Sequence, residues 1–233
     1  MLPKGREKTK PLRELRVNSV KKIFLIGDSI RMGYDKYVKS ALENVAEVYY
    51  PEENGRFAEY VLRYAQGWKK QLELSEDIDL VHWNAGLWDI LELYGDEPLT
   101  TPEYYENVVL RIHKRLRMFF PKAKIVFATT TAVIESKCNA TFMRRNSVIE
   151  EYNERARKAL AGTDAVINDL YALTKDCPEQ CHSDGVHFAT PEGIALTGGA
   201  VIATICRELS ISAKDVNIES FEPEKYTPEN IGM

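Results

Sequence analysis

Short apolar runs recur along the chain, and longer amphipathic stretches separate them. Most of the runs are too continuous to be strands with one solvated face, so they predict parallel β-strands that are covered on both faces. The predicted strands are residues 22–27, 45–50, 78–84, 124–130 and 165–168.

The stretches between these runs have helical periodicity. The clearest one begins at Thr101, a capping residue followed by proline, and its apolar positions step by three or four residues until Pro121. Residues 141–160 are a second predicted helix, and the last begins at Thr190, again before a proline. Strands that alternate with helices predict a three-layer α/β/α sandwich with a mostly parallel sheet.

Composition is typical of a globular protein, with 233 residues of which 44% are hydrophobic and 28% charged. This length favours a single α/β domain over residues 21–213, preceded by a basic arm (1–20) and followed by a tail (214–233). No apolar run is long enough to cross a bilayer, and the N-terminus lacks the apolar centre of a secretory signal. We therefore expect cytoplasmic residence and no membrane partner.

The charge of the chain is unevenly distributed. Residues 1–22 contain eight lysines and arginines and two glutamates, a net charge of +6. Because the whole chain has a net charge of −4, the remainder carries −10. An acidic body argues against a nucleic-acid groove, so no nucleic-acid partner is expected.

The chain contains four cysteines, two of which could belong to a metal site. Cys177 and Cys181 are followed directly by His182, a spacing that could suit zinc. Structural zinc sites usually combine two such pairs, and the sequence contains no second one. The irregular spacing also argues against a disulfide framework. The prediction is that the protein binds no metal.

Polar and glycine-rich loops follow several of the predicted strands, at the edge of the sheet where α/β proteins bind ligands. Ser29 follows the first strand, and Asp184 and His187 precede the last helix. A serine hydroxyl is a weak nucleophile until a base removes its proton, and His187 can act as that base while Asp184 orients the imidazole ring. The set predicts acyl transfer, in which the backbone N–H groups of Ser29 and Gly55 and the side-chain amide of Asn84 stabilise an oxyanion.

These motifs resemble those of the SGNH/GDSL hydrolase superfamily. The resemblance rests on Gly27-Asp28-Ser29-Ile30, on Asp184-x-x-His187, and on Gly55 and the segment 84–89 between them, and it spans residues 22 to about 209. It implies a flavodoxin-like sandwich with strand order 2-1-3-4-5. It also implies a serine hydrolase of esters, with Ser29 as nucleophile, His187 as base, Asp184 as its orienting acid, and the Ser29 and Gly55 amides in the oxyanion hole.

One position departs from the family pattern. Trp88 stands where the family block Gly-x-Asn-Asp has the asparagine that completes the oxyanion hole. The segment Asn84-Ala85-Gly86-Leu87-Trp88-Asp89 resembles the N-x-G-x-W-D pattern of some SGNH branches, including PC-esterase-like proteins. We favour Asn84 as the replacement donor, with the indole N–H of Trp88 as the alternative.

Other residues near the loops have both a functional and a structural interpretation. Arg31, Arg56 and Trp88 are candidate substrate-binding residues, although the arginines could equally form salt bridges and the tryptophan could simply pack. His82 is expected to be a buried structural histidine, and His113 and His182 to be on the surface. Residues 91–100 are the best candidate for a loop over the site.

The expected activity is hydrolysis of small acyl esters through an acyl-enzyme, with acetyl groups on carbohydrates preferred as substrates. The residues leave two alternatives: an acyltransferase on the same scaffold, and a non-catalytic binding protein with a decayed oxyanion hole. No nucleotide-binding signature is present, so no cofactor is expected. An α/β-hydrolase elbow is disfavoured because Arg31 occupies the position of its last glycine. The oligomeric state is not predicted.

Overall fold

The computed structural model describes residues 20–218, and its central element is a five-stranded parallel sheet. Counted along the chain, the order of these strands is the predicted 2-1-3-4-5. All five predicted strands are confirmed, with ends that differ by one or two residues. The strands are β1 (Lys21–Ile26), β2 (Ala46–Tyr49), β3 (Leu80–Trp83), β5 (Lys124–Ala128) and β7 (Val166–Asn168), in the spatial order β2-β1-β3-β5-β7.

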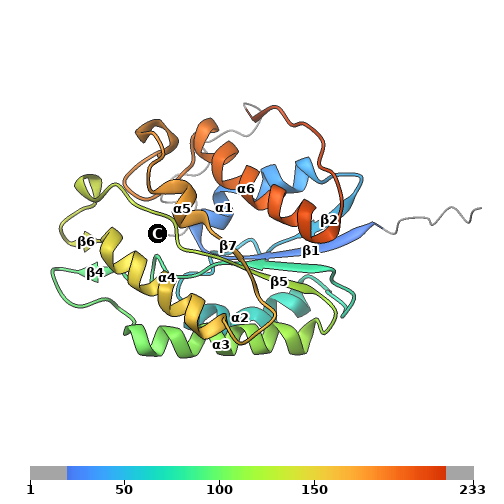
Figure 1. Cartoon of the computed structure of the whole chain (residues 1–233), viewed down its shortest axis with the longest axis horizontal. Helices are drawn as coiled ribbons and strands as arrows, with labels where there is room; N and C mark the ends of the chain where they lie inside the picture. Colours follow the sequence, from blue (N-terminus) through green and yellow to red (C-terminus); the bar gives the residue numbers. More distant parts are fainter. Residues whose placement is uncertain (1–19, 219–233) are drawn as a thin grey trace, which may run out of the picture.

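Helices cover both faces of the sheet, which confirms the three-layer sandwich. On one face α1 packs against α6, with the short α5 beside them, and α2, α3 and α4 cover the other face (Figure 1). Thr101 and Thr190 cap α3 and α6 as predicted, each accepting a backbone N–H bond. The bounds are α1 (Ser29–Ala41), α2 (Ala58–Gln71), α3 (Pro102–Phe119), α4 (Asn146–Leu160), α5 (Leu170–Thr174) and α6 (Pro191–Leu209).

The central strands are buried on both faces, which explains why their apolar runs are continuous. Ile23 to Ile26 of β1 are fully buried, and so are Leu80 to Trp83 of β3. Ile26 pairs with Trp83, and Trp83 with Phe127, so β1, β3 and β5 end together at one edge. The loops that follow these strands are thereby brought to the same edge.

A second, two-stranded sheet lies at this edge and was not predicted. β4 (Glu92–Leu93) pairs antiparallel with β6 (Phe142–Met143), on the side of the molecule to which the main strands point (Figure 1). The predicted helix over 141–160 therefore begins only at Asn146. Two single 3₁₀ turns, η1 (Glu135–Lys137) and η2 (Glu179–Cys181), complete the loops at this edge.

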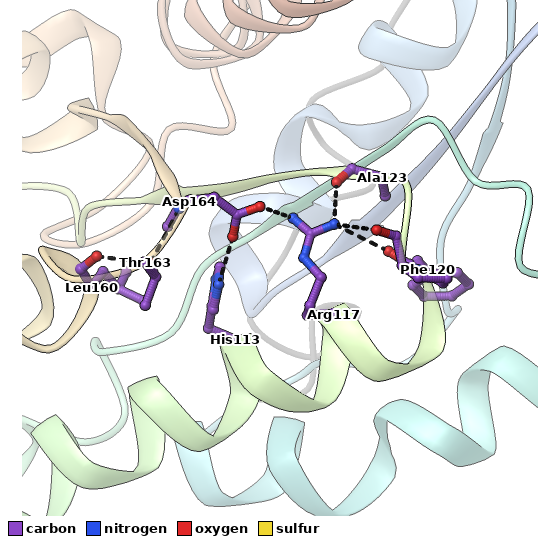
Figure 2. Close-up of polar contacts among 9 residues, drawn as sticks. His113, Arg117, Phe120, Ala123, Leu160, Thr163 and Asp164 are labelled. Carbon is purple, nitrogen blue, oxygen red and sulfur yellow. Dashed lines mark hydrogen bonds and ion pairs between the residues drawn. The ribbon is translucent and has the colours of Figure 1, made fainter.

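A polar network closes the opposite edge of the sheet. Asp164, in the loop before β7, binds Nε2 of His113 at 3.1 Å and the guanidinium of Arg117, both on α3 (Figure 2). Arg117 also donates to the carbonyl oxygens of Pro121 and Ala123, at 2.9 and 2.8 Å. The expectation that His113 is solvated is wrong, because its side chain is only 5% exposed and faces the loop rather than solvent.

The predicted basic arm (1–20) lies outside the described residues except for Val20, and so does the predicted tail (214–233) beyond residue 218. The first described part of that tail returns to α1, where the backbone N–H of Lys214 donates to the carbonyl of Ala41 at 2.9 Å. Within residues 20–218, none of the helices combines the length and the apolar character that a membrane span needs.

Candidate active site

Ser29 stands at the junction between the central strand and the first helix. β1 ends at Ile26, and the side chain of Asp28 caps α1 by accepting the N–H of Ile30 at 3.0 Å. Ser29 is the first residue of that helix and is 4% exposed. Asp28 is thus the capping residue, and it holds Ser29 at the positive end of the helix dipole.

Three side chains from the two ends of the domain meet here. Ser29 Oγ lies 3.0 Å from Nε2 of His187, and Nδ1 of His187 lies 2.7 Å from Oδ2 of Asp184. A carboxylate only accepts hydrogen bonds, so Nδ1 carries the proton and Nε2 is free to accept one from the hydroxyl. The predicted residues Ser29, Asp184 and His187 therefore form one continuous hydrogen-bonded chain, which we call the triad.

The Asp184 carboxylate is held by its own loop. Its Oδ1 accepts the backbone N–H groups of Val186 at 2.6 Å and His187 at 2.7 Å. Burial opposes ionisation of this carboxyl, but the hydrogen bonds and charge of His187 and the two backbone N–H groups outweigh burial. The pKa of Asp184 is therefore well below its usual range, and the group is ionised throughout the neutral pH range.

The structure changes the predicted oxyanion hole at Gly55. The N–H of Gly55 donates to the carbonyl oxygen of Gly27 at 2.8 Å, so it serves to join two loops and does not point to an oxyanion. The N–H of Ser29 lies in the first turn of α1, where helix geometry supplies no acceptor. Of the two predicted backbone donors, only Ser29 has a geometry that leaves its N–H available.

Asn84 follows β3 and lies against the start of the loop that carries Ser29. Its Nδ2 donates one hydrogen to Oδ1 of Asp28 at 2.8 Å, and an amide group has a second hydrogen to offer. A side chain at Gly27 would place Cβ 1.9 Å from Oδ1 of Asn84, so glycine is required there. The two loops therefore fit together only with this pair of residues.

The two candidate arginines do not face the triad. Arg31 is 1% exposed, binds Oδ2 of Asp35 at 2.5 Å and donates to the carbonyl of Glu53 at 2.7 Å. Its predicted substrate contact is wrong, because the guanidinium is used to fix the loop after β2 to α1. Arg56 is exposed, and its guanidinium lies over the ring of Tyr60, 5.3 Å from the centroid.

A cavity of about 320 Å³ opens beside the triad on its Asp184 side. Trp88 forms part of its wall and packs edge-on against Phe57, with ring centroids 5.6 Å apart. Arg144, directly after β6, also lines the cavity, and sequence reasoning missed it. The sequence offers no signal that separates Arg144 from its neighbour Arg145, since only the pairing of β4 with β6 turns one inward.

The other histidines near the sheet edge are structural. His82 on β3 is fully buried beside the Asn168 amide, 3.1 Å away, and burial lowers its pKa to about 3. His182 is 9% exposed and packs on Phe188, so its expected surface position is wrong. His182 Nε2 lies 3.6 Å from Sγ of Cys177. Over residues 20–218 no group of three or more His, Cys, Asp or Glu side chains is arranged to hold a metal ion.

Comparison with solved structures identifies the fold. A lipase/acylhydrolase from Enterococcus faecalis matches with a TM-score of 0.65 at 21% identity, covering 84% of this chain and 100% of that one. A GDSL-like lipase from Bacteroides thetaiotaomicron matches at 0.62 and 15% identity, covering 80% and 88%. An acetyl xylan esterase matches at 0.59 and 17% identity, covering 79% and 99%. No family model matches the sequence, and no curated protein does. The chain thus has the fold of the SGNH/GDSL hydrolases.

Proposed function

We propose that this protein is a serine hydrolase that cleaves carboxylic esters through an acyl-enzyme on Ser29. The observation that carries the proposal is the chain of contacts from Ser29 Oγ to His187 Nε2 and from His187 Nδ1 to Asp184, at 3.0 and 2.7 Å. These are the distances that a nucleophile, its base and an orienting carboxylate require.

The reaction proceeds in two halves. Ser29 Oγ attacks the ester carbonyl carbon while its proton passes to Nε2 of His187, and a tetrahedral intermediate forms. Its collapse breaks the carbon–oxygen bond to the alcohol, which leaves with the proton from His187. Water then attacks the acyl-enzyme, gives its proton to the same nitrogen, and the acid is released as Ser29 regains its hydrogen. The anionic Asp184 stabilises the imidazolium formed in each half.

Two donors are assigned to the oxyanion: the Ser29 backbone N–H and the second hydrogen of the Asn84 amide. Asp28 supports this assignment because its bond to Asn84 fixes the plane of the amide. Loss of one such donor costs about 10²–10³ in kcat. Replacing Asn84 with alanine is therefore expected to slow the reaction by that factor.

The substrates are small acyl esters, with acetyl groups on carbohydrates as the preferred class. Ser29 and His187 are only 4% and 3% exposed, which leaves little room beside them and favours a small acyl group. The structural similarity to an acetyl xylan esterase is consistent with this class.

The test combines turnover with labelling of the nucleophile. The purified protein should hydrolyse p-nitrophenyl acetate, and a fluorophosphonate probe should label Ser29, as mass spectrometry of the peptide would show. Ser29→Ala should abolish both signals. The exposed Ser147→Ala variant on α4 is the matched control and should retain both.

Two other results would replace the proposal. Absence of both hydrolysis and Ser29 labelling would identify a binding protein that only retains the fold. If hydrolysis is slow and added sugars become acylated at a higher rate, the protein is an acyltransferase, because water and an alcohol compete for the same acyl-enzyme.

A further inference from the structure

A buried guanidinium lies beside the candidate active site without an acidic partner. Arg144 is 5% exposed, and its Nε donates to the carbonyl of Leu87 at 2.7 Å. Among residues 20–218, no carboxylate side chain forms an ion pair with it. Burial lowers the pKa of Arg144, as expected for a cation that is removed from water without a direct counter-charge. Such a charge is costly unless something pairs with it.

The other charged groups around the same cavity, Lys137 and Asp184, already have partners of their own. Lys137 forms an ion pair with Glu179 on η2. The Asp184 carboxylate is bound by His187 and by two backbone N–H groups. Arg144 is therefore the one cationic group in the described wall that has no ion-pair partner. The remaining wall is mainly apolar and includes Trp88, Leu91, Cys138, Phe142 and Val186.

We propose that this cavity binds an oxyanion group, a carboxylate or a phosphate, on the alcohol portion of the ester substrate, and that Arg144 is the residue that recognises it. The proposal rests on the proposed ester hydrolysis and specifies its substrate class. Guanidinium binds both groups in a bidentate manner. A cavity of about 320 Å³ is large enough for a small ligand.

The position of Arg144 relative to the triad explains why the anion belongs to the alcohol. Asp184, Gly185 and Val186, the loop that leads to His187, line the cavity. An alcohol that occupies the cavity therefore leaves on the side of the base that must protonate it. Arg144 is close enough to act electrostatically on Asp28 and Asp184, the two carboxylates that flank Ser29 and His187. An anion bound there therefore lies within one small molecule's length of the reacting carbonyl.

The anchoring of Arg144 supports a binding role. The bond from Nε to the Leu87 carbonyl holds one edge of the guanidinium, and the terminal amino groups are left to a ligand. Leu87 immediately precedes Trp88, so the same contact orders the aromatic wall of the cavity. A preformed fork of this kind loses little entropy when it binds a planar anion.

The test uses three acetyl esters that differ in one substituent. These are 4-acetoxybenzoate, 4-acetoxyphenyl phosphate and the neutral 4-acetoxybenzamide. Arg144→Met should lower kcat/KM for at least one anionic ester by about 10–100-fold more than for the amide, mainly through KM, which is the scale of a lost charged hydrogen bond. Comparing variant with wild type cancels the intrinsic reactivity of each ester. Arg145→Met, which removes an exposed neighbour paired with Glu92, is the control and should not change the ratio.

A binding measurement separates this proposal from the proposed function. Calorimetry on the Ser29→Ala protein measures the affinity for the three corresponding phenols. Either 4-hydroxybenzoate or 4-hydroxyphenyl phosphate should bind at least about tenfold more tightly than 4-hydroxybenzamide. This measurement leaves Arg144 intact, so it does not depend on the folding of its variants. Equal affinity for all three refutes the anion site even if esters are hydrolysed. Anion-selective binding without any esterase activity supports the site and refutes the hydrolase. The anion that binds more tightly, carboxylate or phosphate, identifies the anionic group of the substrate.

Discussion

Asp89 provides a prediction that does not depend on activity. This residue follows β3, is fully buried, and accepts the N–H of Ala58 at the start of α2 through Oδ2 at 3.0 Å. Burial raises its pKa to about 7, against the opposing effect of that hydrogen bond. We predict that Asp89→Asn, which keeps an acceptor for Ala58 but cannot ionise, stabilises the protein relative to wild type as the pH rises.

The magnitude follows from the two pKa values. The folded carboxyl keeps its proton up to about pH 7, whereas the unfolded one loses it near 3.8. The contribution of Asp89 to stability is thus complete below 3.8 and declines as the pH rises through about 7. At 1.36 kcal/mol per pKa unit the full loss is about 4 kcal/mol, of which about 2.6 kcal/mol falls between pH 5 and pH 8.

Urea unfolding at several pH values between 5 and 9 measures this effect directly. The difference in unfolding free energy between Asp89→Asn and wild type should shift in favour of the variant by about 2.6 kcal/mol from pH 5 to pH 8. Asp215→Asn, the same substitution at an exposed position, is the matched control. A flat difference for Asp89→Asn would mean that this carboxyl is ionised in the folded protein, and the reasoning would fail.

Three further predictions concern the site, the loop before Ser29, and helix α2. Asp184→Asn should reduce kcat on p-nitrophenyl acetate by about 10³–10⁴, because an amide N–H facing His187 Nδ1 forces the proton onto Nε2; a loss below tenfold would exclude the proposed role. Gly27→Ala should lower the melting temperature, since its Cβ would lie 1.9 Å from Asn84 Oδ1. Gly67→Ala, within α2 and with open space around it, should instead raise stability by about 0.5–1 kcal/mol, as differential scanning fluorimetry would show.

The sheet could be predicted because its physical cause is local. A strand buried on both faces must be apolar at successive positions, and the residues from Ile23 to Ile26 are all apolar and all buried. Ser29 and His187 are 158 residues apart, and periodicity alone does not bring them together. They could be paired because both follow from one rule, that loops at the carboxyl ends of parallel strands share an edge.

The predictions from sequence fail at positions where tertiary contacts determine the direction of a side chain or of a backbone N–H group. Arg31 is buried because Asp35, one helical turn later, can pair with it, and this i, i+4 spacing was a usable signal. Gly55 points its N–H at Gly27 because two loops approach closely, which no local pattern encodes. The two-residue strand β6 exists only through its pairing with β4, so the inward position of Arg144 could not be predicted.

The tryptophan at position 88 can be explained by the different positions of residues 84 and 88 in the loop that follows β3. Asn84 lies beside the loop that carries Ser29 and shares a hydrogen bond with Asp28, whereas Trp88 lies in the cavity wall against Phe57. An amide at position 84 is held by the same carboxylate that caps the helix of Ser29, so the proposed oxyanion donor and the proposed nucleophile are positioned by one residue. Position 88 is then free to carry an aromatic ring, and a large apolar surface next to a buried guanidinium suits a ligand that is flat, apolar at its centre and anionic at its end.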